Sequence, residues 1–236
     1  MRTGLGEVLE IYADTDRRFR ARISCPQALI PAPGQYVLAY GSEVGGDVIA
    51  HSLFPGYQYK KTKSTPVNAF QTAMPVPPTW LPGTKLNMRG PMGNGFQLPE
   101  NIHRLALIAF GQTVSCLLPL IPQVLQAGGD IALFSSTPLA QLPSAVEIHP
   151  LEALSDSLSW ADFIVIALQW QNLSTLREVP GLNADQYLGI GSQILIHAPM
   201  PCNGIADCGV CALPAPRGYK LICRDGPVFD LKELEL

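Results

Sequence analysis

Residues 105–135 read LALIAFGQTVSCLLPLIPQVLQAGGDIALFS, and this run decides the fold of the second half of the chain. Residues 105–110 are continuously apolar, as expected for a parallel strand that is buried on both faces. Residues 114–127 form a helix-length apolar segment that ends at Gly128-Gly129, and residues 131–135 predict the next strand. A strand, a helix and a strand in this order predict a parallel α/β layer.

Two further apolar runs extend this layer toward the carboxyl end. Residues 163–168 (FIVIAL) and 193–197 (QILIH) each have the length and composition of a buried strand. The predicted α/β layer therefore reaches from about residue 101 to residue 197.

The first hundred residues have a different pattern, in which short strand-like runs are separated by turn residues. Their spacing predicts an antiparallel β-barrel. The predicted strands are residues 6–13, 19–24, 35–40, 47–53, 66–74 and 84–88. The fold class is thus an α+β multidomain protein, with a barrel at 1–100, a parallel α/β domain at 101–197 and a small C-terminal module at 198–236.

Composition limits the kinds of function that need to be considered. The chain has 236 residues, of which 47% are hydrophobic and 15% are charged, so it is globular with a sizeable core. No basic stripe suggests a nucleic acid partner. The N-terminus has no apolar signal segment, and the longest apolar stretch, residues 114–127, is too short to span a bilayer. These features predict a cytoplasmic protein whose thiols are reduced.

Four cysteines are crowded into the C-terminal module. Cys202, Cys208, Cys211 and Cys223 have the spacing C-x5-C-x2-C-x11-C. Short loops between cysteines allow several sulfurs to converge on one metal centre. The spacing is one residue longer in its first gap than the plant-type pattern for a [2Fe-2S] cluster. We therefore predict that the four cysteines bind one [2Fe-2S] cluster.

Zinc is the alternative, because four thiolates also suit a tetrahedral zinc site. Zinc ribbons usually have two C-x2-C pairs, whereas this chain has one tight pair between two single cysteines. The two remaining cysteines, Cys25 and Cys116, lie in strand-like and helix-like apolar runs, and we predict that they are small core residues. The chain has no G-x-S-x-G elbow, P-loop or H-E-x-x-H motif, so no catalytic residue is predicted.

Several short motifs carry a resemblance to a known family. The module ends in Asp225-Gly226-Pro227-Val228-Phe229, directly after Cys223 and Arg224. Earlier in the chain are the runs PGQYV at 33–37, GPMGNGF at 90–96 and LLPL at 117–120. Together these motifs resemble the electron-transfer subunit of dihydroorotate dehydrogenase, a ferredoxin-reductase-like flavoprotein with a C-terminal [2Fe-2S] module.

The resemblance implies FAD in the barrel, but the flavin motif is altered. The family carries Arg-Pro-x-Ser on one strand, where the arginine meets the FAD pyrophosphate. The corresponding stretch here includes His51, Ser52 and Leu53 after Ala50, so a serine is kept and the arginine is not. A neutral imidazole is a weaker phosphate partner than a guanidinium group. The family's second flavin segment, a helix that begins Gly-Thr, is not recognisable in residues 57–73.

The nicotinamide motifs are altered further, and the same comparison argues against NAD binding. The family joins the first α/β strand to its helix by a glycine-rich turn, because the phosphates of the cofactor press on bare backbone. Only Gly111 of that turn is present here, and Phe110 and Thr113 place side chains in it. A second family motif, Ala-Cys-Gly-Pro, is replaced by residues 167–170, which read ALQW.

These observations predict a cluster-bearing electron-transfer subunit, with FAD, of a dihydroorotate-dehydrogenase-like complex in pyrimidine biosynthesis. The resemblance implies a catalytic dehydrogenase subunit or another redox protein as the partner, and it leaves self-association within a hetero-oligomer open. Two alternatives also stay open. One is a non-enzymatic, ferredoxin-like adaptor that keeps only the cluster, and the other is a zinc-stabilised binding module.

Overall fold

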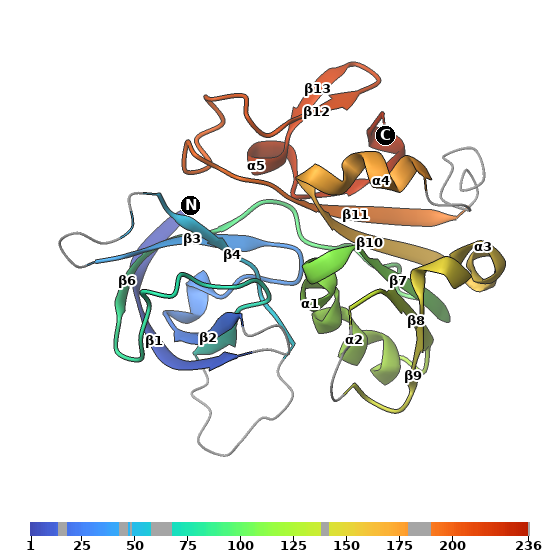
Figure 1. The fold of residues 1–236 in the computed structure, drawn as a ribbon, viewed down its shortest axis with the longest axis horizontal. Helices are drawn as coiled ribbons and strands as arrows, with labels where there is room; N and C mark the ends of the chain where they lie inside the picture. The colour runs from blue at the N-terminus through green and yellow to red at the C-terminus, as the bar shows by residue number, and fades with distance from the viewer. Residues whose placement is uncertain are drawn as a thin grey trace.

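A computed structural model describes the fold (Figure 1). It describes residues 1–13, 18–42, 47, 49–57, 68–137, 142–178 and 190–235. The N-terminal sheet lies on the left of Figure 1, the α/β part on the right, and the C-terminal module above both. No helix of these described ranges combines the length and apolar character that crossing a membrane requires.

The N-terminal part is a six-stranded antiparallel sheet with the strand order β4-β3-β6-β1-β2-β5. An antiparallel bridge between Pro55 and Thr72 joins the ends of its two edge strands, so the sheet curls toward a barrel. Its strands are β1 (Arg2–Ala13), β2 (Phe19–Ser24), β3 (Tyr36–Gly41), β4 (His51–Leu53), β5 (Ala69–Gln71) and β6 (Lys85–Met92). The predicted runs at 47–53 and 66–74 extend into residues outside the described ranges, and the strands found there are shorter.

Strand β3 is buried on both faces, which explains its apolar sequence. Val37 and Ala39 point into the barrel core, and Tyr36 and Leu38 join the larger core that the α/β part supplies. Alternate residues of a strand face opposite sides of the sheet, so one strand serves both cores. The barrel and the α/β part are therefore packed together through β3.

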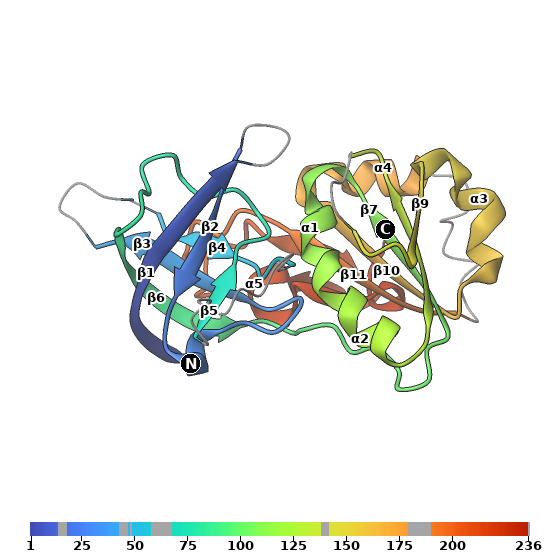
Figure 2. The same cartoon turned by 90° about the horizontal axis from the view of Figure 1, so that it is seen from below.

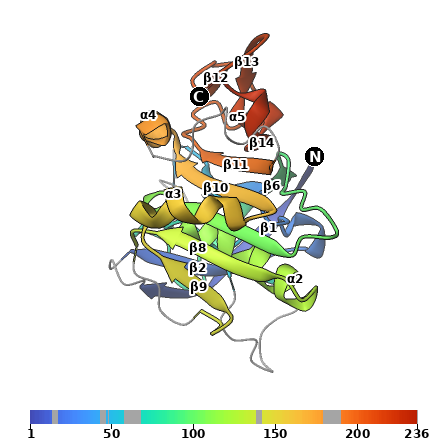
Figure 3. The same ribbon diagram turned by 90° about the vertical axis from the view of Figure 1, so that its right-hand side faces the viewer.

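The second sheet is mixed: the strands predicted within residues 101–197 pair parallel, and an antiparallel strand from the C-terminal module is added at one edge. Its order is β14-β11-β10-β7-β8-β9, and β14 pairs antiparallel with β11 while the other pairs are parallel. Figure 3 shows these strands stacked from β11 down to β9. They are β7 (Arg104–Ala109), β8 (Asp130–Ser135), β9 (Val146–His149), β10 (Phe163–Gln169), β11 (Gly191–His197) and β14 (Val228–Asp230).

The predicted helix at 114–127 is present, but it is divided into short pieces. It consists of α1 (Val114–Leu117), a 3-10 turn (Leu118–Leu120) and α2 (Ile121–Gln126). Pro119 and Pro122 stand at the start of the second and third pieces, because proline lacks the N–H that an inner helical position must donate. The predicted end is confirmed, since the backbone N–H of Gly129 bonds to the Val124 carbonyl at 3.0 Å.

The remaining elements lie after β9 and in the C-terminal module. They are α3 (Leu154–Ser157), α4 (Leu173–Glu178), the hairpin strands β12 (Ala212–Ala215) and β13 (Gly218–Leu221), and α5 (Ile222–Asp225). Viewed from below in Figure 2, the two large sheets lie side by side, and Figure 1 shows α5 in the C-terminal module above them. The module shares one buried core with both neighbours, so its predicted boundary at residue 198 stays a prediction.

Candidate iron–sulfur site

The four C-terminal cysteines come from two loops and a short helix. Cys202 and Cys208 flank the loop that follows β11, Cys211 directly precedes β12, and Cys223 lies in α5. The long last gap of the cysteine spacing is the β12–β13 hairpin, in which Ala212 pairs with Leu221. Because the hairpin folds back on itself, the N–H of Ile222 reaches the Cys211 carbonyl at 3.0 Å. The hairpin therefore returns Cys223 to the side of Cys211.

The cysteines form two pairs. The thiols of Cys202 and Cys208 are close neighbours, and so are those of Cys211 and Cys223, with Cys202 also close to Cys223. Each iron of a [2Fe-2S] cluster takes two protein ligands, so two neighbouring thiol pairs suit its two irons. Across the described residues, no group of three or more His, Cys, Asp or Glu side chains is arranged to hold a single metal ion.

The loop around Cys202 favours a thiolate. Burial acts to raise the pKa of this thiol, but a hydrogen bond from Cys208 and the backbone N–H groups of Ala206, Asp207 and Cys208 lower it to about 6. Thiolates are the form that binds metals, and backbone N–H groups directed at sulfur stabilise a cluster. Residues 203, 204, 206 and 209 have positive φ angles, which turn the loop so that these N–H groups converge.

Cys223 has the opposite environment. Burial and the hydrogen bond with Cys211 raise the pKa of its thiol to about 12, so a metal must displace a tightly held proton there. Cys25 and Cys116 are buried, as predicted for core residues. Burial raises the pKa of Cys25 to about 11 and that of Cys116 to about 12.

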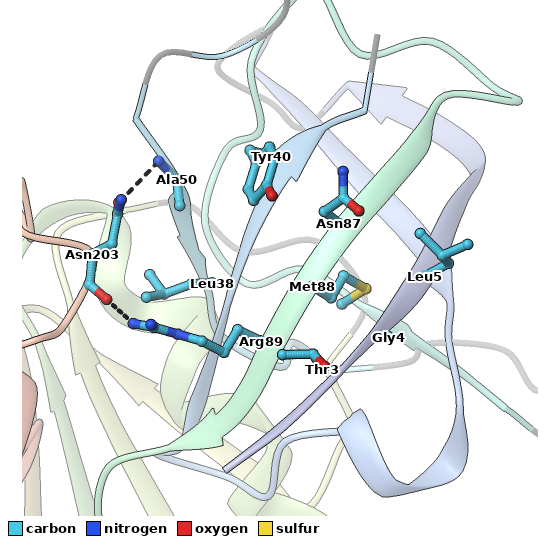
Figure 4. Close-up of a pocket in the computed structure, with 10 residues that line it drawn as sticks. All are labelled: Thr3, Gly4, Leu5, Leu38, Tyr40, Ala50, Asn87, Met88, Arg89 and Asn203. Carbon is cyan, nitrogen blue, oxygen red and sulfur yellow. Dashed lines mark hydrogen bonds between the residues drawn. The ribbon is translucent and has the colours of Figure 1, made fainter.

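The outer face of the barrel touches the loop beside Cys202 (Figure 4). Asn203 accepts two hydrogen bonds there: its side-chain oxygen from the N–H of Ala50 at 3.3 Å, and its carbonyl from the Arg89 guanidinium. Leu38 lies between these two bonds in the same view. These residues line one side of a pocket of about 420 Å³ on the face formed by β1, β3 and β6.

A second contact joins the barrel to the part of the site that contains Cys223. The hydroxyl of Tyr36 donates to the Cys223 carbonyl at 3.1 Å, and both groups are buried. The Tyr36 ring also packs against Phe54, with ring centroids 5.6 Å apart. Sequence reasoning missed Tyr36, Arg89 and Asn203 as site residues. The only available signal was that Tyr36 and Arg89 lie in or beside the PGQYV and GPMGNGF motifs.

Two of the family-like motifs meet each other in space. The N–H of Asn94 bonds to the Gly226 carbonyl at 2.7 Å, and its side chain donates to the Asp225 carbonyl at 2.8 Å. A Cβ on Gly93 would lie 2.4 Å from Pro227 and 2.6 Å from the Gly226 carbonyl, so only glycine fits. The DGPVF segment therefore packs against the GPMGNGF turn, which explains why these distant motifs occur together.

The predicted flavin residues of β4 point in different directions. The Leu53 side chain is buried in the barrel core, and His51 pairs with the Asp47 carboxylate at 3.5 Å on the same side of the strand. Ser52 faces the α/β part, where its hydroxyl lies 3.4 Å from Nε2 of His197. Of the three predicted residues, the structure therefore directs only Ser52 toward the seam between barrel and α/β part.

The turn after β7 is closed by a side chain. The hydroxyl of Thr113 lies within hydrogen-bonding distance of the Phe110 carbonyl at 3.0 Å and of the Ala167 carbonyl at 2.7 Å. Thr113 is fully buried, so it ties the carboxyl ends of β7 and β10 together where a dinucleotide fold exposes backbone. Phe110 is also buried at this turn.

Comparisons with known proteins agree with this architecture. The fold is ferredoxin-reductase-like. The solved structure of an NADH-dependent reduced ferredoxin-NADP oxidoreductase matches with a TM-score of 0.69 and 18% identity, over 98% of this chain and 89% of that one. The ferredoxin reductase of carbazole 1,9a-dioxygenase matches with a TM-score of 0.60 and 16% identity, over 84% and 68% of the two chains. These likenesses show the fold.

The module and the sequence give a more particular likeness. Residues 199–235 match the family model of the iron-sulfur cluster binding domain of dihydroorotate dehydrogenase B. A probable dihydroorotate dehydrogenase B (NAD(+)) electron transfer subunit from Thermoplasma volcanium is 27% identical over 189 residues, which is 74% of this chain and 70% of that protein. The resemblance that the motifs predicted is confirmed.

Proposed function

We propose that this chain is an electron-transfer subunit of a dihydroorotate-dehydrogenase-like complex, and that Cys202, Cys208, Cys211 and Cys223 hold one [2Fe-2S] cluster. The observation that carries the proposal is the arrangement of two thiol pairs in a module that matches an iron-sulfur domain. Such a cluster, when bound, accepts and releases single electrons.

The four cysteines differ in their exposure to solvent, so the module has a buried side and an exposed side. Cys211 and Cys223 are buried against the rest of the chain, whereas Cys208 is exposed. Ile205 and Val210, which lie in the two loops between the first three cysteines, are 66% and 52% exposed. We infer that electrons arrive from the barrel side and leave at the exposed loops, where a catalytic dehydrogenase subunit or another redox protein docks.

We also propose that FAD binds at the seam between the barrel and the α/β part, next to Ser52 and His197. The support is the likeness to the relative from Thermoplasma volcanium and the ferredoxin-reductase-like fold. Residues 50–53 supply no guanidinium for the pyrophosphate, and residues 58–67, which fall within the stretch searched for the family's second flavin segment, lie outside the described residues.

One observation favours a second candidate, the ferredoxin-like adaptor that carries only the cluster. At the seam, Ser52 touches His197 directly, and the ring of Phe54 packs edge-on against His197 with centroids 5.7 Å apart. Direct packing of this kind leaves less room for a flavin ring between the two parts. Flavin content therefore separates the two candidates.

The experiment is to purify the protein anaerobically and to quantify flavin against iron by absorbance and by release of the bound cofactor. A flavin band near about 450 nm at one flavin per cluster supports the electron-transfer subunit with FAD. A cluster spectrum without flavin selects the adaptor. Zinc without acid-labile sulfide selects a zinc-stabilised binding module and overturns the proposal.

We infer further that the chain does not take electrons from NADH at the turn after β7. Thr113 and Phe110 fill the place where phosphates would meet backbone. Rapid bleaching of the purified protein by NADH in the absence of any partner would contradict this inference.

A further inference from the structure

Arg89 is a cation of the barrel with no carboxylate partner among the residues that the structure describes. It lies on β6, where its backbone pairs with Thr3 on β1 and Leu38 on β3, and its side chain is half-buried on the outer face of the sheet. Other cations of the chain face carboxylates, for example Arg22 with Glu10 at 3.0 Å and Arg104 with Asp162 at 2.8 Å. No carboxylate among the residues that the structure describes lies within ion-pairing distance of Arg89.

The guanidinium of Arg89 instead reaches the cysteine loop. It donates to the carbonyl of Asn203, the residue that directly follows Cys202. The neighbouring Gly204 packs on the same surface, since a Cβ there would lie 2.7 Å from Met92 and 3.4 Å from Leu38. The positive charge is thus fixed beside the first predicted ligand, as Figure 4 shows for Arg89 and Asn203.

Removing a cation from water without a counter-charge is unfavourable, so a half-buried unpaired arginine calls for an anionic neighbour. A [2Fe-2S] core with four thiolate ligands carries net negative charge, and reduction adds one further negative charge. A fixed cation nearby therefore stabilises the reduced form more than the oxidised form.

We propose that Arg89 is the counter-cation of the cluster and that its charge raises the cluster's reduction potential. This inference rests on the proposed function, because it requires a cluster at the four cysteines. The hydroxyl of Tyr36, which donates to the Cys223 carbonyl, is a second and weaker contribution from the same barrel face. The barrel thereby sets how easily the module accepts an electron.

The reaction tested is the transfer of one electron from a chemical reductant, such as dithionite acting through mediators, to the oxidised cluster. The reductant is oxidised by one electron for each cluster reduced, and no bond in the protein is made or broken. The potential at which half of the cluster is reduced is read from the visible spectrum and from the paramagnetic signal of the reduced state.

The test compares the wild-type protein with Arg89→Gln and Arg89→Lys. We expect Arg89→Gln to shift the ratio of reduced to oxidised cluster about tenfold toward the oxidised form at a fixed potential, which is about 59 mV for a one-electron couple. Arg89→Lys keeps the charge, and its ratio should stay within about threefold of the wild-type value.

Arg22→Gln is the matched control, because it removes the same charge from the same barrel at a site paired with Glu10. Its potential should equal that of the wild type. An Arg89→Gln protein with a full complement of iron and sulfide and an unchanged potential would overturn the proposal. So would a shift of equal size in Arg22→Gln.

Arg89→Lys decides the matter if Arg89→Gln assembles no cluster. The proposal then requires that Arg89→Lys assemble one with a near wild-type potential, and failure of the lysine variant to do so overturns it. The proposed function fails separately, namely if the wild-type protein itself contains no iron and sulfide. A wild-type cluster with no effect of Arg89 refutes only this inference.

Discussion

At the scale of single residues, the local setting of each cysteine decides its role. Cys202 lies in a turn whose N–H groups point at its sulfur, whereas Cys25 and Cys116 are enclosed by apolar side chains. The sequence alone predicted this division, because spacing separates the clustered cysteines from the isolated ones. It did not predict that Cys223 lies beside Cys211, because that contact depends on the β12–β13 hairpin.

Substituting single cysteines tests the ligand assignment. We expect Cys211→Ser to lose most bound iron, because a serine oxygen is a poorer ligand for iron than a thiolate. Cys25→Ala is the matched control, since Cys25 is buried in the barrel core away from the module. It should keep full iron content and lose only about 1 kcal/mol of unfolding free energy. Colorimetric iron and sulfide assays measure the cluster content of both variants, and denaturant unfolding measures the stability of Cys25→Ala.

Gly204 and Gly209 provide a second residue-scale comparison. Both have positive φ angles, 70° and 67°, but a Cβ on Gly204 would lie 2.7 Å from Met92, whereas one on Gly209 would meet nothing within 4 Å. We expect Gly209→Ala to cost about 1 kcal/mol of unfolding free energy and Gly204→Ala up to about 1 kcal/mol more, because the methyl group at the end of the flexible Met92 side chain must move aside. Denaturant unfolding of the two variants measures the difference, and equal losses would contradict the packing of this loop on the barrel.

At the scale of elements, continuous apolar runs were the reliable signal. Residues 105–110, 131–135 and 163–168 all correspond to strands within one or two residues. The strands that were missed are short or carry turn residues. Pro214 and Gly218 lie in the β12–β13 hairpin, and β14 has three residues that become a strand only by pairing with β11. Their formation depends on tertiary contacts rather than on local periodicity.

Removing the hydroxyl of Thr113 tests how much its hydrogen bonds at the turn after β7 stabilise the α/β part. In Thr113→Val the buried Phe110 carbonyl loses the hydroxyl, so we expect a loss of about 1 to 3 kcal/mol in unfolding free energy. Thr137→Val is the matched control, because its hydroxyl also donates to a carbonyl, that of Gly111 at 2.9 Å, but in a half-buried position. A loss in Thr113→Val no greater than in Thr137→Val would show that the turn is not tied as described.

At the scale of the whole molecule, the site depends on contacts between residues far apart in the chain. Tyr36 and Cys223 are separated by 187 positions, and Arg89 and Asn203 by 114. Nothing in the local sequence indicates such pairs. The three-part organisation could therefore be predicted, whereas the hydrogen bonds between the barrel and the C-terminal module could not. One contact between the barrel and the module was indicated by the family resemblance, because the two motifs that contain Gly93 and Pro227 pack against each other.

Acid should weaken the seam between the barrel and the α/β part through His197. Burial lowers the pKa of His197 below its ordinary value of 6.5, and the side chain faces Ser52 and Phe54, neither of which is charged. The unfolded chain therefore takes up this proton before the folded chain does. The stability that neutral His197 contributes is present above about pH 6.5 and is lost as the pH falls below that value.

The measurement is the unfolding free energy of the wild type and of His197→Gln between about pH 7.5 and pH 5.5. We expect the wild type to lose stability more steeply than the variant over this window, because glutamine does not titrate. Parallel curves would show that His197 is not held neutral at the seam. The comparison of two curves removes the contributions of the other histidines, which both proteins share.

The most direct test of the account is the content of metal and inorganic sulfide in anaerobically purified protein, together with the paramagnetic signal after reduction. The account predicts about two irons and two sulfides per chain, no stoichiometric zinc, and a reduced-state signal of a [2Fe-2S] cluster. A colourless protein that contains one zinc and no sulfide would contradict it.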